Sequence, residues 1–81
     1  MIDFFNLEFN DTNNTPKYKQ IVESISQLIQ SGNIKYGQKL PSINQVSFDY
    51  YISRDTVEKA YAVLKETGVI ESVKGRGHFV V

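Results

Sequence analysis

The stretch Ser53-Arg54-Asp55-Thr56-Val57 decides the fold that this sequence predicts. It opens an amphipathic run in which Val57, Ala60, Tyr61 and Leu64 recur at helical spacing and form an inner face. Such a helix start sets an arginine, two hydroxyls and several backbone N–H groups at one tip, which suits a helix that enters a DNA major groove. Because Ser53 also fits an ordinary N-cap, the stretch alone leaves both interpretations open.

A first helix is predicted well before this stretch. Thr15 is the expected N-cap and Pro16 the first helical residue, and Gly32 is expected to end the helix. Between them lies one apolar stripe with steps of three and four residues: Tyr18, Ile21, Val22, Ile25, Leu28 and Ile29. This helix is predicted to be core scaffold.

A second, short helix is predicted directly ahead of the opening stretch. In Leu40-Pro41-Ser42 the serine is the expected cap, and Gln45 completes a capping-box pattern. The helix is expected to run to about Asp49. The side chains expected to face inward are Ile43, Val46 and Phe48. Tyr50-Tyr51-Ile52 then forms the turn, which is unusual in lacking glycine.

A β-hairpin is predicted after the third helix, which Thr67-Gly68 ends. Its strands are expected at 69–73 and 78–81, joined across Lys74-Gly75-Arg76-Gly77. The predicted fold is mainly α with a small β-hairpin: a winged helix-turn-helix of three helices plus a two-stranded wing, over residues 15–81. A plain three-helix bundle is the alternative.

Residues 1–14 are predicted to be an N-terminal arm or leader. Phe5, Leu7 and Phe9 alternate with polar residues, which favours a short strand or extended arm. A disordered tip and an arm that bridges two copies are both compatible with this pattern.

Composition indicates a small globular protein without disulfides. The chain has 81 residues, 41% of them hydrophobic, and no cysteine, which suits the cytoplasm. It lacks a secretory signal pattern and any apolar run long enough for a membrane span. Net charge is zero, which is unusual for a nucleic-acid binder. Residues 31–81 nevertheless hold seven basic and five acidic groups, which points to this part as the binding face.

The tip of the third helix offers candidate DNA contacts. Arg54 could read a guanine with its two-pronged guanidinium or clamp a phosphate, and its alternative is a surface pair with Glu58. Ser53 and Thr56 could donate to phosphates or bases. Asp55 is expected to cap locally, because it would repel phosphate.

The hairpin tip offers a second group of candidates. Gly75 and Gly77 permit positive φ and a close backbone approach, and Lys74 and Arg76 bring positive charge beside them. A solvated tip without a partner is the alternative. His78, the only histidine, is expected to be a strand residue near DNA or solvent.

Catalytic, metal and cofactor sites find no support in the sequence. There is no nucleophile–base pair, no paired carboxylates and no phosphate loop followed by a lysine. We therefore expect neither an enzyme nor a bound cofactor or metal.

A series of residues through nearly the whole chain after the leader matches, in order, the sequence pattern of a known protein family. They are Pro16-x-Tyr18-x-Gln20-Ile21, Gly32, Gly37-x-x-Leu40-Pro41-Ser42, Ser53-Arg54-x-Thr56-Val57, Ala60-Tyr61, Leu64, Gly68, Ile70 and Gly75-x-Gly77-x-Phe79-Val80. This series resembles the DNA-binding domain of GntR-type bacterial transcriptional regulators. The resemblance covers residues 16–81.

The resemblance implies a winged-helix domain that binds operator DNA for transcriptional regulation. Its DNA-binding residues would be Ser42, Asn44, Ser53, Arg54, Thr56, Lys74, Gly75 and Arg76. Many members carry an arginine where this chain has Asn44. The Asn44 amide can still hydrogen-bond a phosphate or an adenine, but it brings no charge.

The resemblance also implies partners. They are double-stranded DNA with an inverted-repeat operator, a homodimer in the full-length protein, and an effector bound by a C-terminal domain beyond Val81. We expect these residues to be an excised domain rather than a very short regulator, mostly monomeric or weakly dimeric on their own and without a membrane partner. The competing function is a winged-helix protein–protein interaction module that does not bind DNA, which the neutral charge favours.

Overall fold

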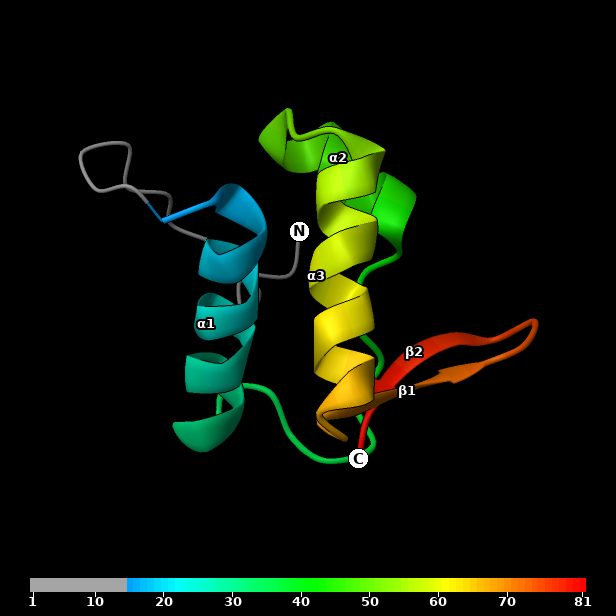
Figure 1. The fold of residues 1–81 in the computed structure, drawn as a ribbon. Helices are drawn as coiled ribbons and strands as arrows, with labels where there is room; N and C mark the ends of the chain where they lie inside the picture. Colours follow the sequence, from blue (N-terminus) through cyan, green and yellow to red (C-terminus); the bar gives the residue numbers. More distant parts are fainter. Residues whose placement is uncertain (1–14) are drawn as a thin grey trace.

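A computed structural model describes residues 15–81, and Figure 1 shows their arrangement. The elements are α1 (Lys17–Gln30), α2 (Ile43–Tyr50), α3 (Arg54–Glu66), β1 (Ile70–Val73) and β2 (Gly77–Val80). Three helices and a two-stranded antiparallel sheet confirm the predicted winged helix-turn-helix. The predicted arm at 1–14 lies outside the described residues.

The α3 helix is the centre of the domain. It packs against α1, α2 and β1. Its predicted inner face, Val57, Ala60, Tyr61 and Leu64, is confirmed, since all four are buried. The rest of the core comes from every other element and from two connecting segments: Ile21, Ile25, Ile34, Leu40, Val46, Ile52, Ile70 and Val80. Because the hairpin shares this core, the alternative of a plain three-helix bundle is wrong.

The start of α1 differs by one residue from the prediction. Pro16, and not Thr15, is the N-cap, because its ψ of 151° is extended although its φ of −58° is helical. Its carbonyl accepts hydrogen bonds from the backbone N–H groups of Lys19 and Gln20 at 3.1 and 3.2 Å. The end of α1 is as expected: Gly32 follows the helix with a φ of +86°.

The α2 helix begins as the sequence predicts. The Ser42 hydroxyl accepts from the Gln45 backbone N–H at 3.0 Å. The Gln45 side chain does not complete the capping box; its amide donates to the two carboxylate oxygens of Asp49 at 3.0 and 2.9 Å. These bonds join two exposed side chains one turn apart on α2. The helix runs to Tyr50, one residue beyond the expected end.

The inward orientation predicted for Phe48 is wrong. The side chain of Phe48 is 79% exposed, whereas Val46 is buried and Ile43 and Tyr50 are half-buried. Phe48 lies two residues from both Val46 and Tyr50, and two helical residues turn the side chain by about 200°. Once those neighbours face the core, Phe48 must face away from it.

The turn between α2 and α3 uses a tyrosine where a glycine is usual. Tyr51 has φ 55° and ψ 45°, the left-handed conformation that commonly ends helices. Its side chain is 94% exposed, while the next residue, Ile52, enters the core. The Ile52 N–H donates to the Ser47 carbonyl at 3.2 Å, and the Ser47 hydroxyl donates to the Ile52 carbonyl. These paired bonds hold the turn against the end of α2.

The wing is a tight antiparallel hairpin with Ile70 opposite Val80 and Val73 opposite Gly77. The first strand starts one residue later than predicted and ends at Val73 as predicted, and the second strand lies one residue earlier at both ends. The turn is closed by the Arg76 N–H, which donates to the Val73 carbonyl at 2.9 Å, and Gly75 has the left-handed φ of +80° that this turn position requires. Glycine is therefore needed at the tip of the wing.

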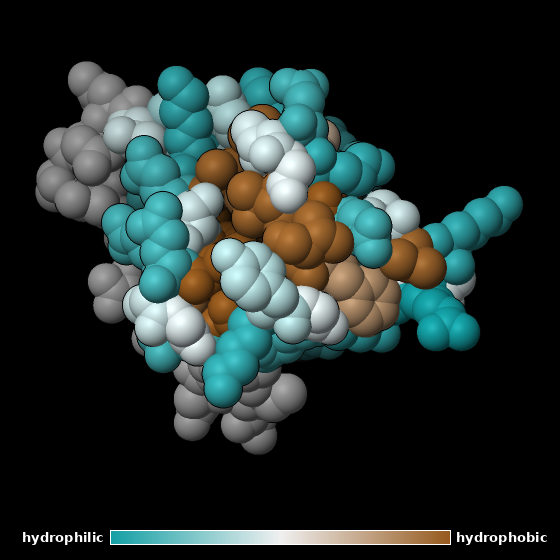
Figure 2. All heavy atoms as spheres, turned by 90° about the horizontal axis from the view of Figure 1, so that it is seen from below, coloured by the Kyte–Doolittle hydropathy of each residue, from teal (hydrophilic) through white to brown (hydrophobic). Residues whose placement is uncertain are grey.

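The lower end of the domain presents apolar surface. Figure 2, which looks at this end, shows hydrophobic side chains gathered at its centre within a hydrophilic rim. The C-terminal residue Val81, 49% exposed, is held here because its N–H donates to the Val69 carbonyl at 3.1 Å. In Figure 1 this end lies opposite α2 and the start of α3.

Candidate nucleic-acid interface

The start of α3 is a capped helix tip. The Ser53 hydroxyl accepts from the Thr56 N–H at 3.2 Å and lies 2.8 Å from the Thr56 hydroxyl. The N-cap interpretation of Ser53 is therefore confirmed, and the two hydroxyls satisfy each other. Asp55 sits in the first turn, where a carboxylate interacts favourably with the helix dipole.

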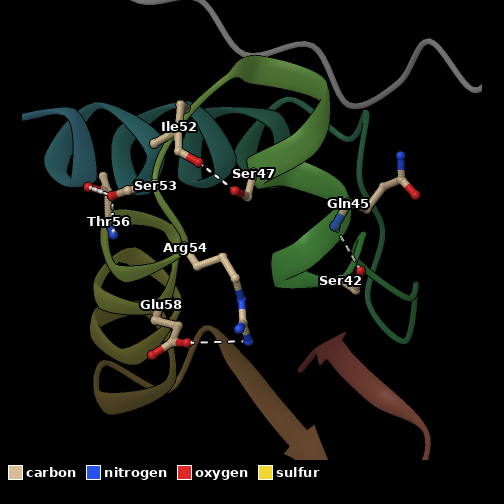
Figure 3. A network of polar contacts seen from close by, with 8 residues as sticks. All are labelled: Ser42, Gln45, Ser47, Ile52, Ser53, Arg54, Thr56 and Glu58. Atoms are coloured by element: carbon tan, nitrogen blue, oxygen red, sulfur yellow. Dashed lines mark hydrogen bonds and ion pairs between the residues drawn. The ribbon is translucent and has the colours of Figure 1, made fainter.

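Arg54 points to a different side of α3. Figure 3 shows the Arg54 side chain extending from α3 toward the start of α2 and the wing strands, with Ser53 and Thr56 together on the other side of the helix start. The structure thus separates the hydroxyl pair from the arginine.

The Arg54 guanidinium forms the ion pair that the sequence offered as its alternative role. Its Nη2 lies 3.6 Å from Glu58 Oε2, and the two side chains are 62% and 50% exposed. Exposed pairs of this kind contribute about 0–1 kcal/mol, because water screens them and ordering two long side chains costs entropy. A phosphate or guanine could therefore displace Glu58 at small cost.

The start of α2 carries the next two candidates, Ser42 and Asn44. Both are exposed, and the Ser42 hydroxyl is engaged in the helix cap. The segment just before them is held from two directions. The Pro41 carbonyl accepts from the buried Tyr61 hydroxyl at 2.7 Å, and the Leu40 N–H donates to the His78 carbonyl at 2.8 Å.

The wing tip carries the last three candidates, Lys74, Gly75 and Arg76, all exposed. In Figure 1 the hairpin projects from the body of the domain beside α3. The tip is therefore accessible to a partner.

Lys39 is a basic residue of this region that the sequence did not indicate. It forms an antiparallel bridge with Phe79, and a Cβ placed on Gly77 would lie 3.0 Å from Lys39 Cε. The Lys39 backbone therefore pairs with β2, and the end of its side chain lies beside Gly77. Its place directly before Leu40-Pro41-Ser42 was the only available signal, since a pairing across forty residues cannot be read from local pattern.

His78 is packed within the domain. It is half-buried, and its ring meets the Tyr61 ring edge to face, with centroids 4.9 Å apart and an 80° angle between the planes. Burial, and then the positive charge of Lys65, lower the pKa of His78, so the imidazole is neutral near pH 7. Burial raises the pKa of the Tyr61 phenol above its usual range, so Tyr61 remains a hydrogen-bond donor.

The described part of the chain holds neither the pattern expected of a metal site nor that of a membrane-spanning helix. Residues 15–81 contain no group of three His, Asp or Glu side chains that could hold a metal ion. Within the same residues, no helix is both long enough and apolar enough to cross a membrane.

The family described as "Bacterial regulatory proteins, gntR family" matches residues 17–80. The chain belongs to the GntR family. Among curated relatives, the HTH-type transcriptional repressor YtrA of Bacillus subtilis is 34% identical over 74 residues, which cover 91% of this chain and 57% of the repressor. The chain therefore spans little more than half the length of this relative.

Solved structures give the same fold. A transcriptional antiterminator from Listeria monocytogenes EGD-e superposes with a TM-score of 0.93 at 32% identity, covering 98% of this chain and 59% of that one. The DNA-binding domain of AraR, in complex with operator ORE1, superposes with a TM-score of 0.79 at 36% identity, covering 95% of this chain and 94% of that one. The fold is therefore that of GntR winged-helix DNA-binding domains.

Proposed function

We propose that this chain binds double-stranded operator DNA and serves as the DNA-binding part of a longer bacterial transcriptional regulator in the cytoplasm. The observation that carries the proposal is the likeness to the AraR domain, which was solved in complex with operators and which this chain matches over nearly its full length. The exposed cations of α3 and the wing support it.

In this proposal the tip of α3 enters the major groove. Arg54 exchanges Glu58 for a guanine edge or a phosphate, both of which accept two hydrogen bonds from a guanidinium. Ser53 and Thr56 hold the helix tip through their mutual bonds and offer remaining hydroxyl capacity to the DNA.

The start of α2 and the wing contact the DNA backbone on either side. Ser42 and Asn44 bring polar groups and a helix N-terminus to a phosphate. Lys74 and Arg76 add charge at the wing tip, and Gly75 allows its backbone to approach closely. Since the net charge of the chain is zero, these local cations supply the electrostatic part of the affinity.

The regulator is proposed to act as a homodimer on an inverted repeat. Helix-turn-helix dimers place two recognition helices about one turn of B-DNA apart, so the operator mirrors the two-fold symmetry of the protein. The dimer contacts and the effector site are assigned to residues beyond the winged helix, which agrees with the greater length of the YtrA repressor.

The alternative of a protein-interaction module is not favoured. The matched relatives are named as transcriptional repressors or regulators, and structural neighbours include operator complexes. A protein-docking role would leave the exposed Arg54, Lys74 and Arg76 without a common explanation.

Selection of bound duplexes from a random pool tests the proposal directly. We expect an enriched sequence whose affinity falls steeply as salt is raised, because phosphate contacts release counterions. Exchange of Lys74 and Arg76 for alanine should flatten the salt dependence by about one unit per lost phosphate contact.

The matched control replaces Lys19 and Lys35, two exposed lysines of α1 and the loop after it, by alanine, which changes net charge equally. Equal slopes for the two double variants would contradict a wing contact. Absence of any enriched duplex would contradict the proposed function as a whole.

A further inference from the structure

Tyr61 is a buried polar side chain to which the proposed function assigns no task. It lies in the middle of α3 and is only 2% exposed. Its hydroxyl donates to the Pro41 carbonyl at 2.7 Å, a contact that joins residues twenty positions apart. This bond ties α3 to the residue directly before Ser42, the cap of α2.

The same ring also contacts the wing. It meets the His78 ring edge to face at 4.9 Å, and His78 belongs to β2. The His78 backbone in turn contacts the segment before α2, because its carbonyl accepts a hydrogen bond from the Leu40 N–H at 2.8 Å. Residues 40–41, the α3 helix and the wing strand thus contact one another in pairs, and Tyr61 makes two of these three contacts.

Each of the three contacting residues, Pro41, Tyr61 and His78, lies close in sequence to one of the proposed DNA-contacting groups. Pro41 is followed by the start of α2 with Ser42 and Asn44. Tyr61 lies seven positions after Arg54, about two turns along the same helix. His78 is two residues from Arg76 at the wing tip. The relative positions of the three groups are therefore coupled through Tyr61.

A different residue could fill the volume but not do the same task. Leucine or phenylalanine would occupy the core without donating to Pro41, and the partly buried Pro41 carbonyl left without its donor would carry a free-energy cost. The segment would relieve this cost by moving toward water, which shifts the start of α2.

We propose that Tyr61 is a positioning residue that fixes the start of α2, the α3 helix and the wing in the arrangement that matches operator DNA, without touching the DNA. The proposal rests on the proposed function, since it concerns the same surface. It predicts that removing one hydroxyl in the core changes operator affinity.

The test compares Tyr61→Phe with Ile25→Val in the complete chain. Both are single conservative deletions at buried positions, but Ile25 lies in α1 and takes no part in these three contacts. Affinity for the selected operator is measured where denaturation curves show both variants to be folded. We expect Tyr61→Phe to weaken operator binding about three- to tenfold, the equivalent of one lost hydrogen bond, and Ile25→Val to leave it within about twofold.

Amide hydrogen exchange provides a readout that does not depend on DNA. In Tyr61→Phe the Leu40 amide, which donates to His78, should exchange faster relative to the α1 amides, whereas Ile25→Val should leave that ratio unchanged.

Wild-type binding together with unchanged affinity of Tyr61→Phe would overturn the proposal while leaving the proposed function intact. If the wild-type chain selects no duplex, the proposed function fails. An unchanged Leu40 exchange ratio in Tyr61→Phe would then overturn the coupling itself, and a raised ratio would support it.

Discussion

The α2 and α3 helices begin in the same way and are held in place differently. Each starts at a serine whose hydroxyl accepts from a backbone N–H three residues on. The α3 helix has thirteen residues, four of them buried, whereas α2 has eight residues and buries only Val46. Two large side chains at the end of α2, Phe48 and Tyr51, face water. Four buried side chains thus anchor α3 in the core, whereas a single buried side chain, Val46, anchors α2.

The largest difference is expected in the core contribution of the two helices. Leu64→Ala in α3 should lower the free energy of unfolding by about 2–5 kcal/mol, because it leaves a cavity at a fully buried site. Val46→Ala in α2 should cost less, since it removes one carbon atom fewer. Denaturation followed by circular dichroism measures both. A smaller loss for Leu64→Ala than for Val46→Ala would reverse the proposed roles of the helices.

The two helix tips should also differ in DNA binding. Arg54→Ala at the start of α3 should weaken binding to the selected operator by about 1–3 kcal/mol, the range for an arginine that reads a base. Asn44→Ala at the start of α2 should have a smaller effect, because an amide brings no charge. Titrations with the operator decide this. A change below twofold for a folded Arg54→Ala would reduce Arg54 to a surface partner of Glu58.

The serine caps allow a more even comparison. Ser53→Ala and Ser42→Ala should each lower the free energy of unfolding by about 1 kcal/mol, the usual contribution of an N-cap. Ser53 should contribute more, because its hydroxyl also contacts the Thr56 hydroxyl at 2.8 Å. Thermal unfolding of the two variants gives the order. Full stability of Ser53→Ala would show that Thr56 caps the helix without it.

The smallest effect is expected on the outer face of α2. Phe48→Ala should change the free energy of unfolding by no more than about 0.5 kcal/mol, as is usual for exposed side chains. Val46→Ala, two residues earlier and fully buried, is the matched control. Equal losses for the two variants would mean that Phe48 packs in the core, as the sequence first suggested.

Local patterns predicted most of the fold because they act over a few residues. The spacing of Val57, Ala60, Tyr61 and Leu64 predicted the buried face of α3 correctly. Phe48 was misassigned because apolar character indicates a tendency to be buried and not a direction, and α2 is too short for its periodicity to fix one. Thr15 was predicted as the N-cap of α1, but the extended ψ angle of Pro16 makes Pro16 the N-cap instead.

The sequence supplied eight candidate DNA-contacting residues, and their roles remain predictions. What the pattern could not provide was their grouping. The hydroxyls of Ser53 and Thr56 bond to each other, on the other side of the helix start from the Arg54 side chain. Lys39 joins the base of the wing through its bridge to Phe79, a pairing that no local signal encodes.

The sequence by itself determined the order of the elements, the serine caps, the left-handed glycine at the wing tip and the choice of residues that α3 buries. Each of these depends on backbone and side-chain preferences within one or two turns of chain. Only the tertiary structure decided where Lys39 lies and that Tyr61 joins Pro41 to His78. These depend on contacts between residues seventeen to forty positions apart, which form only when the core brings the segments together.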